Sequence, residues 1–297
     1  MTASASSFTE RPLPRWKRAV LKVGSSLVAA PGGGLTPRYA LALAQFVSSS
    51  RQAGREVVIV SSGAVAAGRA IVPGALESGA VMAARQALAA LGQAQLIGLW
   101  QRFFERPVAQ VLLTHDDLRN RRRYLNARAT LLELLRLDAI PVVNENDTVS
   151  VDELKLGDND NLAAFVAALV DADLLLIASD VPGLYTANPR SDPLARPVDE
   201  VAEVGESILA MAGGAGSVIG TGGMATKLQA AAKAAGAGIQ TVLFDGTDAD
   251  ALRLMAHGTV RGTLVRASLS RTAARKHWLR HAPSAPGAVL VDAGAAR

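Results

Sequence analysis

The sequence contains no cysteine, and this absence excludes disulfides, thiolate zinc sites, iron–sulfur clusters and cysteine nucleophiles. Its four histidines lie far apart or near the end of the chain, so we expect no histidine metal site. No apolar run reaches the roughly 18 residues that a membrane helix needs. Residues 1–14 are polar and lack the apolar segment of a secretory signal. We therefore expect a cytoplasmic protein without a membrane partner.

Lysine is also scarce, since only six of the 31 basic residues are lysines, and each lysine at a special place is therefore informative. The formal charge of +5 suits an anionic ligand such as a nucleotide. An arginine run over residues 119–124 could contact nucleic acid, but a solvated loop explains it more simply, so we expect no nucleic-acid partner. Of the 297 residues, 49% are hydrophobic, which excludes a disordered chain.

Apolar strand-like runs alternate with helical segments along the chain. Strands are predicted over residues 18–24, 56–63, 109–114, 139–144, 174–178 and 241–244. Helices are predicted over residues 36–52, 77–105, 126–137, 161–170, 224–235 and 248–255, with a surface hairpin over 149–156 and an irregular loop over 182–197. This alternation predicts an α/β fold with a mainly parallel sheet covered on both faces, in which ligands bind beyond the carboxyl ends of the strands.

Polar or glycine-rich clusters follow these strands. They are residues 22–26 (KVGSS), 61–64 (SSGA), 144–147 (NEND), 157–161 (GDNDN), 178–185 (ASDVPGLY) and 220–227 (GTGGMATK). Each one alone is also explained by a strand end or a helix cap. Six clusters at one edge of a sheet favour a ligand site, and the glycines before Lys227 suit a phosphate. The carboxylates of Asp147, Asp158 and Asp160 would repel one another unless Mg²⁺ or a lysine ammonium lay close.

Longer segments carry a resemblance to a known family. They read LKVGSSLV, VIVSSGAVAAGR, NRRRYLNARATL, PVVNENDTVSVDELKLGDNDNLAA, DLLLIASDVPGLYTANPR and GTGGMATKLQAA, between about residues 18 and 245. Together they resemble the amino acid kinase family, and within it the members that act on glutamate. The resemblance implies a three-layer αβα sandwich and transfer of phosphate from ATP to the side-chain carboxylate of L-glutamate. The product would be glutamyl 5-phosphate, in the first step of proline biosynthesis.

The resemblance also assigns roles to particular residues. Glutamate would contact Ser62, Asp147 and Asn159. Catalysis would use Lys22 and Lys227, held in place by Asp160. ATP would contact Lys22, Ser179, Asp180, Thr221, Gly222, Gly223, Met224, Ala225, Thr226 and Lys227. Mg²⁺ would be held mainly by the ATP phosphates and water, with no dedicated protein ligands. A carboxylate nucleophile is already ionised at neutral pH, so the reaction needs no general base.

The resemblance further implies feedback inhibition by L-proline and a homo-oligomer, a dimer or a tetramer. We expect a flexible N-terminal tail over residues 1–15 and a kinase domain over 16–270. Residues 271–297 resemble the linker and the first strand of a PUA domain, which is otherwise truncated or absent. Other readings remain: a kinase for acetylglutamate, aspartate, carbamate or UMP, a non-catalytic nucleotide or amino-acid sensor, or an RNA-binding protein.

Overall fold

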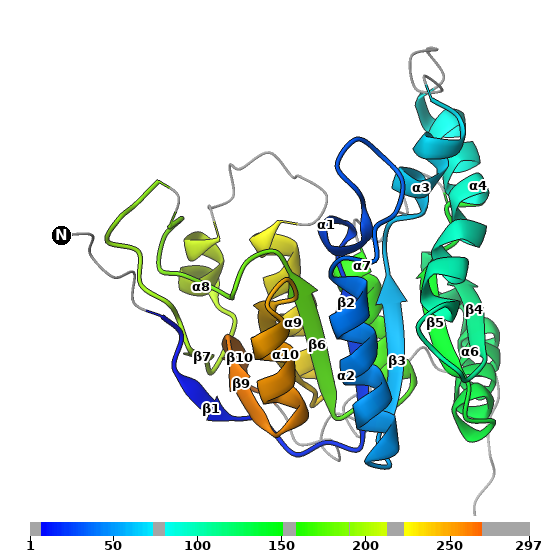
Figure 1. Ribbon diagram of the computed structural model, residues 1–297. Helices are drawn as coiled ribbons and strands as arrows, with labels where there is room; N and C mark the ends of the chain where they lie inside the picture. The colour runs from blue at the N-terminus through cyan, green and yellow to red at the C-terminus, as the bar shows by residue number, and fades with distance from the viewer. Residues whose placement is uncertain (1–6, 74–80, 151–158, 190, 213–222, 269–297) are drawn as a thin grey trace, which may run out of the picture.

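The computed structural model describes residues 7–73, 81–150, 159–189, 191–212 and 223–268. Its centre is an eight-stranded sheet with the order β4-β5-β3-β2-β6-β8-β10-β7 (Figure 1). The strands are β2 (Arg18–Val23), β3 (Glu56–Ser61), β4 (Val108–Leu113), β5 (Ile140–Glu145), β6 (Leu174–Ser179), β7 (Glu200–Val201), β8 (Gln240–Asp245) and β10 (Thr263–Val265). Each neighbouring pair is parallel except β10 with β8.

Helices cover both faces of this sheet. They are α1 (Ser25–Val28), α2 (Ala40–Gln52), α3 (Ala64–Ile71), α4 (Val81–Gln101), α5 (His115–Arg119), α6 (Arg121–Arg136), α7 (Asn159–Leu169), α8 (Glu206–Met211), α9 (Met224–Gly236) and α10 (Ala249–Ala256). One apolar cluster joins the sheet to α2, α4 and α10, and a second joins it to α6, α7 and α9. The expected three-layer αβα sandwich is thereby confirmed.

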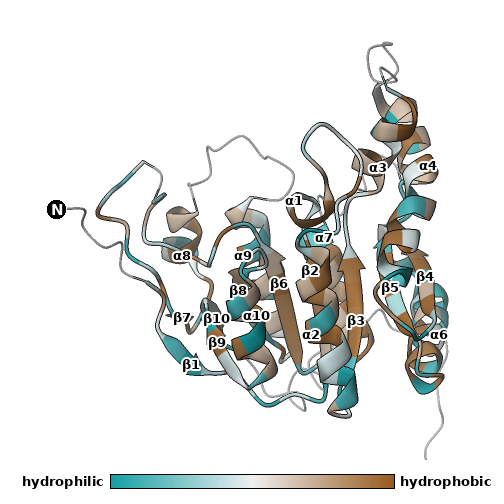
Figure 2. Cartoon of the chain, in the orientation of Figure 1, coloured by the Kyte–Doolittle hydropathy of each residue, from teal (hydrophilic) through white to brown (hydrophobic). Residues whose placement is uncertain are grey.

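The strands are apolar on both faces because both faces are covered. Along β2, Val20 belongs to one apolar cluster and Leu21 to the other, as the alternation of side chains along a strand requires. Figure 2 shows the same pattern, with β3 and β6 strongly hydrophobic at the centre of the molecule. Such unbroken apolar runs are typical of parallel sheets buried between helices.

The register aligns the ends of the three central strands. Val23 at the end of β2 lies opposite Ser61 of β3 and Ala178 of β6. Lys22, one residue earlier, pairs with Val60 and Ile177. The clusters that follow β2, β3 and β6 in the sequence therefore meet at one edge of the sheet.

Helices α3 and α4 cross with their backbones in contact. A Cβ atom added to Gly92 would lie 1.9 Å from the carbonyl oxygen of Ala64, and one added to Gly68 would lie 2.0 Å from that of Leu88. Only glycine fits at either position, because a side chain would meet a rigid backbone rather than a movable group. The two glycines thus fix how closely the helices approach.

The N-terminal segment departs from the prediction. β1 (Glu10–Pro12) pairs antiparallel with β9 (Thr259–Arg261), and Phe8 and Leu13 are buried. The Phe8 ring also meets Tyr185 edge-on, with 5.2 Å between the ring centroids. These contacts correct the expected flexible tail over residues 1–15 for residues 8–13, because two apolar side chains anchor an otherwise polar stretch.

Two helix starts also differ from the prediction. α6 begins at Arg121, because Asn120 caps it by accepting a hydrogen bond at Oδ1 from the Arg123 amide, 3.1 Å away. Most of the arginine run therefore lies on a helix and not in a loop. α2 begins at Ala40 and not at Thr36, whose hydroxyl accepts from the Arg38 amide in a preceding turn.

Several predictions fall on residues outside the described ranges. They concern the hairpin over 149–156 beyond its first two residues, the start of the glycine-rich loop with Thr221 and Gly222, and the PUA-like segment over 271–297. Among the described helices, none combines the length and apolar character that crossing a membrane requires.

Candidate active site

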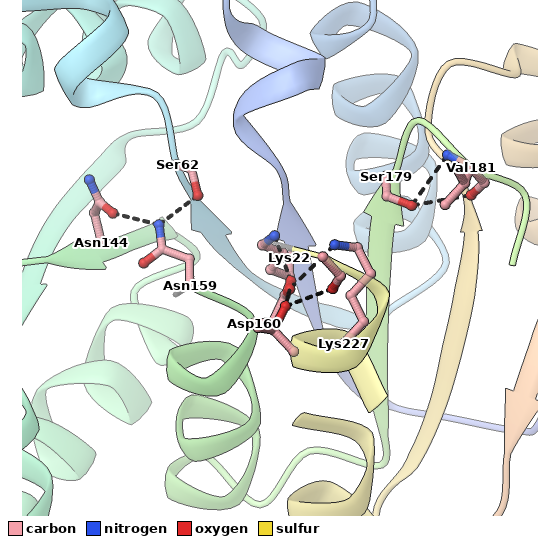
Figure 3. A network of polar contacts seen from close by, with 10 residues as sticks. Lys22, Ser62, Asn144, Asn159, Asp160, Ser179, Val181 and Lys227 are labelled. Atoms are coloured by element: carbon pink, nitrogen blue, oxygen red, sulfur yellow. Dashed lines mark hydrogen bonds and ion pairs between the residues drawn. The ribbon is translucent and has the colours of Figure 1, made fainter. Parts of the chain in front are cut away.

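A buried carboxylate holds two lysines at the carboxyl edge of the sheet. Asp160, in the first turn of α7, has no exposed surface. Its Oδ1 lies 2.5 Å from Nζ of Lys22, and its Oδ2 lies 3.4 Å from Nζ of Lys227. The hydroxyl of Thr226 lies 3.0 Å from the same Oδ2. Figure 3 shows Asp160 beside Lys22 and Lys227. The structure thus has the contact between Asp160 and both lysines that the sequence led us to expect.

Three different elements bring these groups together. Lys22 stands one residue before the end of β2, and Lys227 lies in the first turn of α9, which begins just after Gly223. Burial raises the pKa of the Asp160 carboxyl, but the charges of Lys22 and Lys227 outweigh this effect. Together with hydrogen bonds from Lys22 and Thr226, they hold the pKa below its ordinary value. Asp160 is therefore an anion at neutral pH.

A second polar cluster lies beside the lysines and consists of neutral side chains. Asn159 donates from Nδ2 to the hydroxyl of Ser62 at 2.7 Å and to Oδ1 of Asn144 at 2.9 Å (Figure 3). Asn144 donates in turn from its Nδ2 to Oε1 of Gln93, 2.9 Å away. Ser62 follows β3, Asn144 lies in β5 and Gln93 lies in α4. We call these four residues the amide cluster.

Glycines keep the backbone open around the lysines. At Gly24 an added Cβ would lie 3.7 Å from Nζ of Lys22, so the backbone of this residue passes close to the ammonium group. Gly63 has a φ of +117°, and a Cβ there would lie 2.7 Å from Cγ2 of Val28. The turn after β3 therefore requires glycine, and this turn positions Ser62.

Further expected site residues lie on either side of these clusters. Ser179 ends β6, and its buried hydroxyl stays within its own turn, 3.1 Å from the carbonyl oxygen of Val181. Asp180 is exposed beside it, and half-buried Asp147 lies in the turn after β5. Met224 and Ala225 form the start of α9 after Gly223.

Gln93 is a member of the amide cluster that the sequence reasoning missed. It lies in an alanine-rich helix with no motif around it. Its signal is positional: Ala89, Leu96 and Trp100 are buried at helical spacing from it, so Gln93 is a polar residue on an apolar face. In the described part of the chain, no group of three or more His, Cys, Asp or Glu side chains is placed to hold a metal ion.

Comparison with known proteins places the chain in a family. The sequence pattern of the amino acid kinase family matches residues 17–245. A protein of Xanthomonas campestris pv. campestris (strain 8004), named glutamate 5-kinase, is 74% identical over 277 residues, which are 93% of this chain and 76% of the relative. A protein of the same name from Xylella fastidiosa (strain 9a5c) is 67% identical over 295 residues, covering 99% and 77%.

A solved structure supports the fold alone. The UMP kinase of Bacillus anthracis superposes with a TM-score of 0.58 at 18% identity, over 87% of this chain and 98% of the other. With the family match over most of the chain, the conclusion is plain: the protein belongs to the amino acid kinase family. Within that family it groups with the glutamate 5-kinases.

Proposed function

We propose that this protein transfers the γ-phosphoryl group of ATP to the side-chain carboxylate of L-glutamate, forming glutamyl 5-phosphate and ADP. The observation that carries the proposal is the pair of lysines on buried Asp160, directly beside the amide cluster. Relatives named glutamate 5-kinase at 67–74% identity support the same substrate. The reaction would serve as the first step of proline biosynthesis.

The chemistry suits a site built from lysines and no histidine. A glutamate carboxylate oxygen attacks the γ-phosphorus, a new O–P bond forms, and the bond from this phosphorus to the β,γ-bridging oxygen breaks. ADP leaves with the electron pair, and no proton has to move. The barrier is mainly electrostatic, because one anion must approach another and charge must shift to the leaving oxygen. Lys22 and Lys227 would supply positive charge there, and Asp160 holds their ammonium groups in place before reaction.

The nucleotide would lie along the edge formed by β2, β6 and α9. Lys22, Gly24 and the start of α9 would face its phosphates, with Ser179 and Asp180 at the end of β6. Thr221 and Gly222 belong to the same proposed loop. Mg²⁺ bound with the phosphates would neutralise part of their charge, and the phosphates and water would be its main ligands.

The amino acid would lie over the amide cluster. Ser62 and Asn159 present a hydroxyl and an amide to this space, and Asp147 would add a carboxylate for the α-ammonium group. Such a pocket would recognise a small zwitterion by hydrogen bonds. It would discriminate strongly against substrates that cannot form all of these hydrogen bonds. This discrimination favours glutamate over acetylglutamate, whose nitrogen carries no charge.

From the family we further infer L-proline as feedback inhibitor, a homo-oligomeric state and a cytoplasmic location. The test of the function itself is ADP release with ATP and Mg²⁺ across a panel of acceptors, with hydroxylamine present to trap acyl phosphates. The panel holds L-glutamate, N-acetyl-L-glutamate, L-aspartate, carbamate and UMP. We expect hydroxamate with L-glutamate alone. Turnover with another acceptor instead would reassign the substrate, and ATP binding without turnover would indicate a sensor.

A further inference from the structure

We infer that Gln93 is a positioning residue: as the buried acceptor for Asn144 it holds the hydrogen-bond chain of the amide cluster in place, and thereby supports the selection of an α-ammonium group. The inference rests on the proposed function, since it concerns how the same pocket recognises glutamate. Gln93 need not touch the substrate. It acts through Asn144, and Asn144 acts through Asn159.

The contacts form a chain with one direction. Oε1 of Gln93 accepts from Nδ2 of Asn144, which leaves Oδ1 of Asn144 as the acceptor on its other side. That Oδ1 accepts from Nδ2 of Asn159, whose second N–H donates to Ser62. Each amide has one donor end and one acceptor end, so fixing the first amide fixes the next.

The end of the chain determines what the pocket offers. Both N–H groups of Asn159 are used, so its Oδ1, which receives no hydrogen bond from the described residues, is left as an acceptor. The Ser62 hydroxyl accepts from Asn159, and its own proton has no acceptor among the described side chains, so it can donate. An acceptor suits an ammonium group and a donor suits a carboxylate. The reversed chain would turn Asn159 Nδ2 toward the pocket and oppose an ammonium group.

Burial makes Asn144 depend on Gln93 for its partner. Gln93 is 8% exposed and Asn144 is 3% exposed, so bulk water cannot replace a missing partner. Nε2 of Gln93 is itself buried and has no hydrogen-bond partner in the described part of the chain. An unpaired buried donor costs stability, and an apolar side chain at this position would avoid that cost. The oxygen of Gln93 is therefore the end of the side chain that serves the cluster.

The experiment compares three variants of α4. Gln93→Leu removes the acceptor, Gln93→Glu keeps an acceptor oxygen whether or not it is protonated, and Gln95→Leu makes the same change on the exposed face two residues away. For each variant the KM for L-glutamate, the KM for ATP and kcat are measured. Inhibition by glutarate, which lacks the α-ammonium group, is measured in parallel.

We expect Gln93→Leu to raise the KM for L-glutamate roughly tenfold, as the loss of one hydrogen bond implies, with little change in the KM for ATP. The strength of inhibition by glutarate should stay within about twofold of that in the wild type, since glutarate has no ammonium group to bind. Gln93→Glu should recover most of the affinity for L-glutamate, and Gln95→Leu should match the wild type.

Three results would overturn the inference. One is an unchanged KM for L-glutamate in Gln93→Leu, another is an equal loss for L-glutamate and glutarate, and the third is a Gln93→Glu variant as impaired as Gln93→Leu. If Gln93→Leu does not fold, the Gln93→Glu variant tests the inference. The ratio of its affinities for glutamate and glutarate must then stay near the ratio in the wild type. If the wild type neither binds nor phosphorylates L-glutamate, the proposed function itself fails, and that result is read from the wild type alone.

Discussion

Lys22 and Lys227 lie far apart in the sequence and yet hold opposite oxygens of one buried carboxylate. The two lysines stand on β2 and α9, and the carboxylate that contacts both of them stands on α7. The two ammonium groups would repel each other without that anion. The arrangement therefore makes separate predictions for Lys227, for the carboxylate and for pH.

Replacing Lys227 with alanine should affect the reaction much more than substrate binding. If Lys227 stabilises the charge that develops during transfer, Lys227→Ala should lower kcat on the order of a hundredfold or more, with a much smaller change in the KM for glutamate. Steady-state kinetics measure both constants. Lys233→Ala is the control, since Lys233 lies on the same helix and its Nζ contacts Asn161 instead. A near-normal kcat in Lys227→Ala would reject the role.

Removing the charge of Asp160 should destabilise the fold. Asp160→Asn leaves two ammonium groups at a buried position without their anion, which is expected to cost about 3–5 kcal/mol of unfolding free energy. Urea unfolding followed by circular dichroism measures the difference. Asp180→Asn removes a carboxylate from the exposed position after β6 and should cost far less. Equal losses in the two variants would contradict this account.

The stabilisation from Asp160 should depend on pH in a defined direction. Its pKa in the folded protein lies below the ordinary value, so folding favours the ionised form. The contribution is fully present above about pH 4, where the carboxyl group of the unfolded chain ionises, and is lost as the pH falls through the lowered folded value. The stability difference between the wild type and Asp160→Asn should therefore be constant near neutral pH and shrink in acid. A difference that grows in acid would have the wrong sign.

The crossing of α3 and α4 makes a prediction about two glycines of one helix. Gly92→Ala would drive a methyl group into the Ala64 carbonyl, so the helices must separate, at a cost of about 1–3 kcal/mol or more. At Gly98 an added Cβ meets nothing within 4 Å, so Gly98→Ala should stabilise α4 by up to about 1 kcal/mol. Thermal melting of both variants tests the contrast. The idea fails if the two substitutions shift Tm in the same direction.

The N-terminal segment should contribute to stability although it precedes the main sheet. Phe8 is 5% exposed and packs on Tyr185, so Phe8→Ala is expected to cost about 3–5 kcal/mol. Glu10→Ala changes an exposed residue of the same segment and should have little effect. Equilibrium unfolding of both variants provides the comparison. If Phe8→Ala left the free energy of unfolding unchanged, the segment would pack on the domain without stabilising it.

The sequence was sufficient to predict those elements whose pattern is visible in a short stretch of residues. The apolar runs of β2, β3, β5, β6 and β8 are recognisable because both faces of each strand are buried. The polar clusters after them could be placed at one edge by the rule for parallel strands. The order of the strands could not be predicted this way, because β2 lies between β3 and β6 through contacts that no local pattern encodes.

Where the prediction failed, a tertiary contact or a cap was decisive. β1 has no apolar pattern of its own and exists because β9 pairs with it. The start of α6 depends on one side chain, Asn120, inside a run that otherwise reads as a charged loop. Gln93 was missed because its importance comes from Asn144 on β5, which faces it from another part of the chain.

One peptide bond separates Asn159, which belongs to the amide cluster, from Asp160, which holds the lysines. Their Cα atoms are thus a fixed distance of about 3.8 Å apart, whatever else moves. The first turn of α7 therefore sets the spacing between the proposed acceptor pocket and the proposed phosphate pocket. A substitution that tilts α7 would carry both pockets along, so the spacing between them would survive changes elsewhere in the domain. An insertion of one residue between them would destroy that spacing even if both clusters still formed.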